Sequence, residues 1–126
     1  MNKTIINTPH APAPIGPYNQ AVLTGNTLYI SGQIPINPVT GALNNATLQD
    51  ETHQSMKNLQ AILTAAGMDF THVIKTTIFI TDMKRFAEIN DVYAQYFTGD
   101  HPARETVQVA ALPKFVNVEI SMIAVK

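Results

Sequence analysis

Two amphipathic helical segments, each lying between segments with strand character, constrain the fold of this 126-residue chain more than any other feature. Thr47, three residues before Asp50, is typical of a helix N-cap, and Gly67 is typical of the residue after a helix end. Between them, about a third of the helical circumference is apolar and contains Leu48, Met56, Leu59, Ile62, Leu63 and Ala66. A second helix is predicted near residues 83–97, with Phe86, Ile89, Tyr93, Tyr96 and Phe97 on one face.

The remaining regular segments alternate in the manner of β-strands. Gly25 and Asn26 predict a tight hairpin between strands at 20–24 and 27–33. Further strands are predicted at 73–81, 105–111 and 116–125, with room for a short one at 3–7. Strand–helix–strand connections in this order imply some parallel pairing, with the helices on one face. We therefore predict a single domain over residues 1–126: an α+β two-layer sandwich in which two helices cover one face of a mixed sheet.

The last predicted strand indicates how the other face of the sheet is used. Alternation gives this strand one wholly apolar face and one mixed face, the latter formed by Asn117, Glu119, Ser121 and Ile123. Charged residues make up only 13% of the chain, about half the usual share. A mixed face on a weakly charged domain predicts a subunit interface that borders a polar pocket, and hence an oligomer.

Composition argues against several classes of function. The chain has no cysteine, so disulfides and thiolate metal sites are ruled out and a cytoplasmic location is expected. The first residues lack a long apolar run, and no stretch approaches the length of a membrane span, so no signal peptide or membrane association is expected. The formal net charge is −1 with scattered cations, which argues against binding to nucleic acid. Motifs for phosphate loops, serine hydrolases and zinc proteases are absent from the sequence.

Two charged residues stand out in strand patterns. Arg104 is one of only two arginines and lies at the start of a predicted strand, where alternation places it with Thr106. Its planar guanidinium suits two-pronged binding of a carboxylate, although an edge arginine with an ordinary surface ion pair is an equally simple interpretation. Glu119 is a lone carboxylate in an apolar strand, either structural or used for proton transfer. From the pattern alone, Asn90 is a satisfied core amide and Tyr18 a packing residue.

Several motifs occur together along almost the whole chain. They are Ala13–Tyr18, Ser31–Pro35, Lys75–Thr77, Phe86–Tyr93 and Pro102–Arg104, followed by Leu112, Pro113 and the strand that carries Glu119. In this order and at this spacing, the set resembles the Rid (YjgF/UK114) family.

The resemblance implies a fold, an assembly and an activity. The fold is chorismate-mutase-like and forms a homotrimer with clefts between neighbouring subunits. The activity is hydrolysis of reactive 2-enamines and 2-imines, such as 2-aminoacrylate (2-iminopropanoate) and 2-iminobutanoate, to 2-keto acids and ammonia, with no cofactor or metal. Carried over residue by residue, it makes Arg104 and Glu119 catalytic, with Arg104 as the carboxylate anchor. The implied substrate-binding residues are Tyr18, Ser31, Gly32, Asn90, Arg104 and Thr106.

One departure from the family pattern bears on the site. Many members have Ser-Cys after the arginine, whereas this chain has Glu105 and Thr106. We expect Thr106 to contribute its backbone N–H and hydroxyl, and Glu105 to point away from the Arg104 face. Two alternative functions remain: a non-catalytic module that binds 2-keto acids and, less favoured by the charge balance, an endoribonuclease or translation inhibitor.

Overall fold

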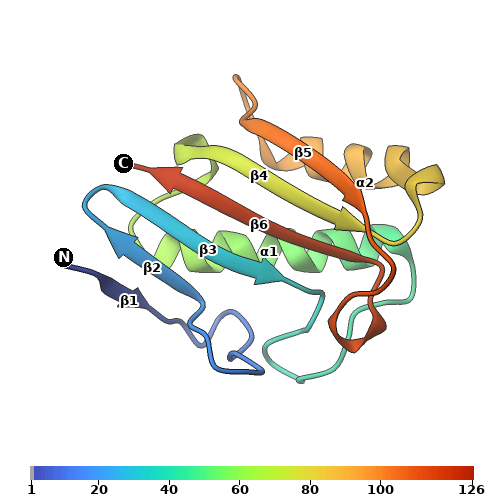
Figure 1. Ribbon diagram of the computed structural model, residues 1–126, viewed down its shortest axis with the longest axis horizontal. Coiled ribbons are helices and arrows are strands. Elements are labelled where there is room, and N and C mark those ends of the chain that lie inside the picture. The colour runs from blue at the N-terminus through green and yellow to red at the C-terminus, as the bar shows by residue number, and fades with distance from the viewer. Residues whose placement is uncertain (1) are drawn as a thin grey trace.

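The computed structural model describes residues 2–126, which form one mixed β-sheet and two α-helices (Figure 1). The strands are β1 (Thr4–Ile6), β2 (Ala21–Thr24), β3 (Thr27–Gln33), β4 (Val73–Ile80), β5 (Ala103–Gln108) and β6 (Val118–Val125). The helices are α1 (Leu48–Ala65) and α2 (Phe86–Tyr93). Within this described part, neither helix is long and apolar enough to cross a lipid bilayer.

The sheet has six strands in the order β1-β2-β3-β6-β4-β5, so the last strand in sequence lies at its centre. Only β4 and β5 pair in parallel, and the other neighbours are antiparallel. Both helices lie behind the sheet in the view of Figure 1, and no helix lies in front of it. The predicted two-layer α+β sandwich with two helices on one face is confirmed, as is the short first strand.

Helix α1 has the predicted ends and the predicted apolar face. The Thr47 hydroxyl accepts a hydrogen bond from the Asp50 backbone N–H at 3.0 Å, which satisfies one free amide of the first turn. Gly67 follows the helix with a φ of 71°, the left-handed conformation that glycine adopts without strain. The main core forms between this helix and the sheet, where the fully buried side chains include Met56, Leu59, Ile62, Leu63, Ile78, Val118 and Ile120.

The second helix is shorter than the sequence predicts. A single helix over 83–97 is wrong, because only Phe86–Tyr93 is α-helical and it is flanked by 3₁₀ turns at Met83–Arg85 and Ala94–Tyr96. The tighter turn after Tyr93 carries Phe97 inward. There its ring packs 4.8 Å from the Tyr93 ring and 5.4 Å from the Phe70 ring, measured between centroids. Burial of an aromatic side chain therefore outweighs continuation of the helix.

The last two strands also differ from their predicted bounds. Strand β5 begins at Ala103, because pairing with β4 starts there, and it ends at Gln108 rather than at 111. Strand β6 begins at Val118 rather than at 116. The residues between them fold into a turn that buries Leu112 and Val116 in a second apolar cluster with Ile34 and Ile36. An apolar residue that looks like the start of a strand is thus used for loop packing.

The face of the sheet without helices has the mixed character that the sequence predicts. Glu119 on β6 is the cross-strand neighbour of Phe79 on β4, which in turn neighbours Val107 on β5. Val107 is 43% exposed, and Tyr29 on the same face is 50% exposed. An open, partly apolar face is consistent with the expected oligomer.

Candidate active site

Arg104 lies on the helix-covered side of the edge strand β5, next to Thr76 of β4. Its Nη1 donates a hydrogen bond of 2.8 Å to Oδ1 of Asn90 on α2. The guanidinium carbon lies 5.1 Å from the centroid of the Tyr93 ring and 5.3 Å from that of Phe86. These contacts hold the guanidinium by its face and by one N–H, which leaves its other donors available.

Arg104 has no acidic partner among residues 2–126, since none of the ion pairs found there includes it. The interpretation of Arg104 as an edge arginine with a surface ion pair is therefore not what the structure shows. By contrast, the other arginine, Arg85, is paired with Glu88 at 2.7 Å. An oriented cation without an anion is suited to bind an acidic ligand.

A pocket of about 330 Å³ opens beside Arg104 and is lined by Asn90, Tyr93, Ala94, His101, Pro102 and Arg104. The Tyr93 hydroxyl donates a hydrogen bond of 2.9 Å to Thr76 Oγ1. Burial raises the pKa of the Tyr93 phenol, although this hydrogen bond and the charge of Arg104 both act to lower it. His101 also lines this pocket, and sequence reasoning did not single it out. Its position three residues before Arg104, next to Pro102, was the available signal.

Thr106 and Glu105 occupy opposite faces of β5, as alternation predicts. The Thr106 hydroxyl is shielded from solvent on the Arg104 side and has no hydrogen-bond partner within the described residues. On the other side, Glu105 pairs with Lys75 at 3.1 Å and accepts a hydrogen bond from Thr77. The Lys75 ammonium holds the pKa of the Glu105 carboxyl below its usual range. Glu105 is therefore engaged away from the Arg104 pocket. We call Arg104, Asn90 and Thr106 the Arg104 group.

Glu119 lies on the helix-free face and packs closely against Gly32 of β3. A Cβ added at Gly32 would lie 2.7 Å from Glu119 Cδ, so only glycine leaves room for the carboxylate in this position. The register between β3 and β6 shifts between Ile30 and Gln33, which places Ser31 and Gly32 at a bulge. Burial raises the pKa of the Glu119 carboxyl.

Ser31, beside Gly32 in β3, and Tyr18, in the loop before β2, are the other residues expected in this part of the site. The Ser31 hydroxyl donates to the Asn19 carbonyl oxygen at 2.6 Å. Tyr18 is 45% exposed, accepts a hydrogen bond from the Ile15 backbone N–H, and lines a small pocket together with Gly32. We call Glu119, Gly32, Ser31 and Tyr18 the Glu119 group.

Gln20 holds the proline-rich loop that carries Tyr18, a role that sequence reasoning missed. Its buried side-chain amide donates to the carbonyl oxygens of Thr8, Ala11 and Pro12 and accepts from the Thr8 backbone N–H. A loop with four prolines lacks regular pairing partners, and one glutamine supplies them. No local sequence pattern indicates this role of Gln20, because its hydrogen bonds reach residues up to twelve positions away.

Arg104 and Glu119 lie on opposite faces of one sheet. Arg104 aligns with Thr76 of β4 on the helix side, whereas Glu119 aligns with Phe79 on the helix-free side. Since successive residues of a strand point to opposite faces, the two candidate catalytic side chains do not face each other within one chain. Among the residues that the structure describes, no cluster of His, Cys, Asp or Glu could hold a metal ion.

The fold and these residues define a class of small α+β proteins with a candidate carboxylate-binding arginine. The sequence profile of the family described as Endoribonuclease L-PSP matches residues 8–126. A solved structure of a conserved Rid family protein, YyfA from Yersinia pestis, superimposes with a TM-score of 0.96 at 48% identity, covering 99% of this chain and 100% of that one. The chain belongs to this family, the Rid (YjgF) family, and the resemblance found in its motifs is confirmed.

Two further relatives bear on function. The 2-iminobutanoate/2-iminopropanoate deaminase of Homo sapiens is 47% identical over 124 residues, covering 98% of this chain and 90% of that protein. The crystal structure of Escherichia coli TdcF with bound serine has a TM-score of 0.94 and 48% identity, with 98% of each chain covered. The chain is thus similar over nearly its whole length to proteins named for imine deamination.

Proposed function

We propose that this protein hydrolyses small 2-enamines and 2-imines of amino acids, such as 2-iminopropanoate and 2-iminobutanoate, to 2-keto acids and ammonia. The observation that carries the proposal is Arg104, which is oriented by Asn90 and two rings and has no acidic partner in the described chain. The nearly full-length likeness to deaminases supports the same reaction.

The Arg104 group anchors the substrate in this proposal. A 2-imino acid carries a carboxylate next to its imine carbon, so two-pronged binding by Arg104 fixes the position of that carbon. The unpartnered Thr106 hydroxyl and the backbone amides near Gly32 and Thr106 provide further hydrogen bonds to the carboxylate or to the developing oxygen.

Glu119 handles the proton and the water. An enamine first takes a proton at its terminal carbon and loses one from its nitrogen, which gives the imine. Glu119 then takes a proton from a water molecule as the water oxygen bonds to the imine carbon, and the nitrogen is protonated. The nitrogen of this carbinolamine takes a second proton and its bond to carbon breaks, so that ammonia leaves. The hydroxyl proton lost in forming the ketone replaces the proton used. A carboxyl whose pKa is raised by burial is better matched to such transfers near neutral pH than an ordinary glutamate.

The site must then be assembled from two copies of the chain. Because Arg104 and Glu119 lie on opposite faces of one sheet, a cleft that contains both requires Arg104 from one subunit and Glu119 from its neighbour. The open face with Tyr29 and Val107 is the surface we assign to this contact. A cyclic homotrimer closes such a heterologous interface.

Subunit mixing tests the reaction and the assembly together. We expect Arg104→Ala and Glu119→Gln each to release little ammonia from freshly generated 2-iminobutanoate. Each mixed trimer, formed by co-refolding equal amounts, contains one intact cleft. The mixture should therefore recover about a quarter of the wild-type rate. The double variant Arg104→Ala/Glu119→Gln, mixed with wild type, is the matched control for dilution. Recovery no greater than the sum of the single variants would place both groups in one subunit's site.

A non-catalytic module that binds 2-keto acids is the second candidate, because the Arg104 group alone suffices to hold a carboxylate. Calorimetric binding of 2-ketobutyrate without any acceleration of ammonia release would favour it. Cleavage of RNA is not supported by the charge of the chain, which has eight Lys and Arg against nine Asp and Glu.

A further inference from the structure

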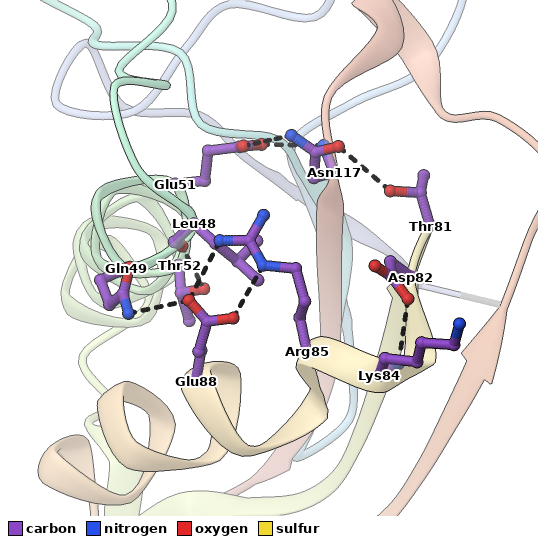
Figure 2. A network of polar contacts seen from close by, with 10 residues as sticks. All are labelled: Leu48, Gln49, Glu51, Thr52, Thr81, Asp82, Lys84, Arg85, Glu88 and Asn117. Carbon is purple, nitrogen blue, oxygen red and sulfur yellow. Dashed lines mark hydrogen bonds and ion pairs between the residues drawn. The ribbon is translucent and has the colours of Figure 1, made fainter.

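Glu51, in the first turn of α1, is a charged residue that is almost completely buried. Only 1% of its surface is exposed. One carboxylate oxygen accepts a hydrogen bond of 2.8 Å from the Asn117 backbone N–H, and the other accepts one of 2.7 Å from Asn117 Nδ2 (Figure 2). Its position three residues after Leu48 places it on the buried face of the helix. A buried carboxylate is costly unless its hydrogen bonds are satisfied, so this pairing has structural consequences.

The Glu51 carboxylate depends on Asn117 rather than on a cation. No ion pair of Glu51 occurs among residues 2–126. Arg85, drawn nearby in Figure 2, donates two hydrogen bonds to Glu88 instead. Because both carboxylate oxygens bind Asn117, Glu51 fixes both the backbone and the side-chain amide of that residue.

Asn117 also contacts the end of β4, which completes a three-residue link. The Thr81 backbone N–H donates to the Asn117 carbonyl oxygen at 3.1 Å, and the Thr81 hydroxyl donates to Asn117 Oδ1 at the same distance. Figure 2 shows Glu51, Asn117 and Thr81 in line. The link therefore joins the start of α1, the end of β4 and the residue before β6.

The segment that this link holds is under backbone strain. Lys114 and Phe115 both have φ values of 56°, which is unfavourable for residues with side chains. Such a turn persists only when its surroundings hold it. On one side Leu112 and Val116 are buried, and on the other Asn117 is held by Glu51. Glu51 thus holds Asn117 at the point where β6 enters the sheet.

We propose that Glu51 is a positioning residue for Glu119, acting through Asn117. Glu119 follows Asn117 by two residues and packs so closely on Gly32 that a Cβ there would lie 2.7 Å from its Cδ. A small shift at the start of β6 therefore moves the carboxylate relative to Gly32. The expected effect of Glu51 on turnover rests on the proposed function of Glu119, whereas its expected effect on the position of the Glu119 carboxylate does not.

The hydrogen-bond pattern allows a swap experiment. Glu51→Gln places an N–H₂ group against a donor of Asn117, and Asn117→Asp places two carboxylates against each other. The double variant Glu51→Gln/Asn117→Asp restores a donor opposite an acceptor at each contact, and the introduced aspartate still accepts from Thr81.

We expect each single variant to lower kcat for 2-iminobutanoate by about tenfold or more, with little change in KM. The double variant should return to within about twofold of wild type. Glu88→Gln, at the exposed pair with Arg85, is the matched control and should leave kcat unchanged.

Titration of Glu119 followed by ¹³C NMR provides a readout independent of activity. Displacement of its carboxylate in Glu51→Gln should shift its titration midpoint, and the double variant should restore it. Thr81→Val, which removes only the outer side-chain bond, gives a milder variant should the single variants fail to fold. Folded variants with wild-type kcat and an unmoved Glu119 titration would overturn the proposal, as would a double variant that restores neither. If wild type lacks imine hydrolysis, the proposed function fails while the NMR titration still decides the role of Glu51.

Discussion

At the scale of single residues, the two arginines have different partners, and only one of them is suited to bind a ligand. Arg85 is an exposed residue with a carboxylate partner, a kind of pair that contributes little to stability because solvent screens it. Arg104 is held by an amide and two aromatic faces and has no carboxylate partner in the described chain. The same side chain therefore has two different uses, and only one of them leaves donors free for a ligand.

Arg104→Ala should abolish detectable hydrolysis of 2-iminobutanoate while leaving the protein folded, because a desolvated two-pronged contact to the substrate carboxylate is lost. Arg104→Lys should restore little, since a point charge cannot reproduce the planar fork. Arg85→Ala is the matched control and should retain activity. Steady-state ammonia release and circular dichroism are the measurements. Near-native rates in Arg104→Ala would mean that the substrate is anchored elsewhere.

Glu119→Gln should lower turnover by about 10²-fold, the low end for loss of a general base, because imine hydrolysis is already fast in water. Binding of 2-ketobutyrate should be nearly unchanged. In wild type, activity should fall as the pH drops through the Glu119 pKa, which burial places above that of an ordinary glutamate. A pH–rate profile checks this. Lost binding with unchanged turnover would make Glu119 an anchor instead.

The same shift carries a stability prediction. Because the folded-state pKa of Glu119 is raised, the folded chain binds this proton more tightly than the unfolded chain. The resulting stability is present below the unfolded pKa and is lost as the pH rises through the folded pKa. Glu119→Gln should therefore raise the melting temperature at pH 7 and have little effect at low pH. A lower melting temperature at pH 7 would mean that the carboxylate stabilises the fold.

At the scale of elements, the β3 bulge and β6 together form the seat of Glu119. Gly32→Ala should displace the carboxylate, because its new Cβ would lie 2.7 Å from Cδ and 2.8 Å from Oε1 of Glu119. We expect turnover to fall toward that of Glu119→Gln while binding of 2-ketobutyrate is less affected. Gly25→Asn is the control, since nothing lies within 4 Å of its Cβ position and asparagine tolerates a φ of 56°. Wild-type turnover in Gly32→Ala would contradict this prediction, because it would mean that Glu119 can move away from the new Cβ without loss of activity.

At the scale of the whole molecule, the helix-free face and the separation of the two groups lead to the same expectation. We expect a homotrimer by multi-angle light scattering at micromolar concentration. Tyr29→Glu, on the exposed part of that face, should weaken it, whereas Val39→Glu, at a 91% exposed loop position, should not. A monomeric mass for active wild type would remove the shared-cleft proposal.

The sequence by itself determined the order of the elements, the two layers, the grouping of Arg104 with Thr106 on one strand face and the place of Glu119 on the mixed face of the last strand. These follow from the periods of 3.6 and 2 residues, which are properties of the local chain. Strand patterns singled out Arg104 and Glu119, and family motifs added the other candidate site residues, but neither showed which of these residues are in contact. The ends of α2 and β6 were misjudged because Phe97 and Val116 are apolar for reasons of loop packing.

Only the tertiary structure decided which distant residues meet. It placed β6 between β3 and β4, set Asn90 and two rings against Arg104, and buried Glu51 against Asn117, sixty-six residues away. A carboxylate at position 51 looks like an ordinary helix N-terminal charge until its partner is known. Hydrogen bonds and aromatic contacts of this kind depend on the packing of whole elements, which no local pattern encodes.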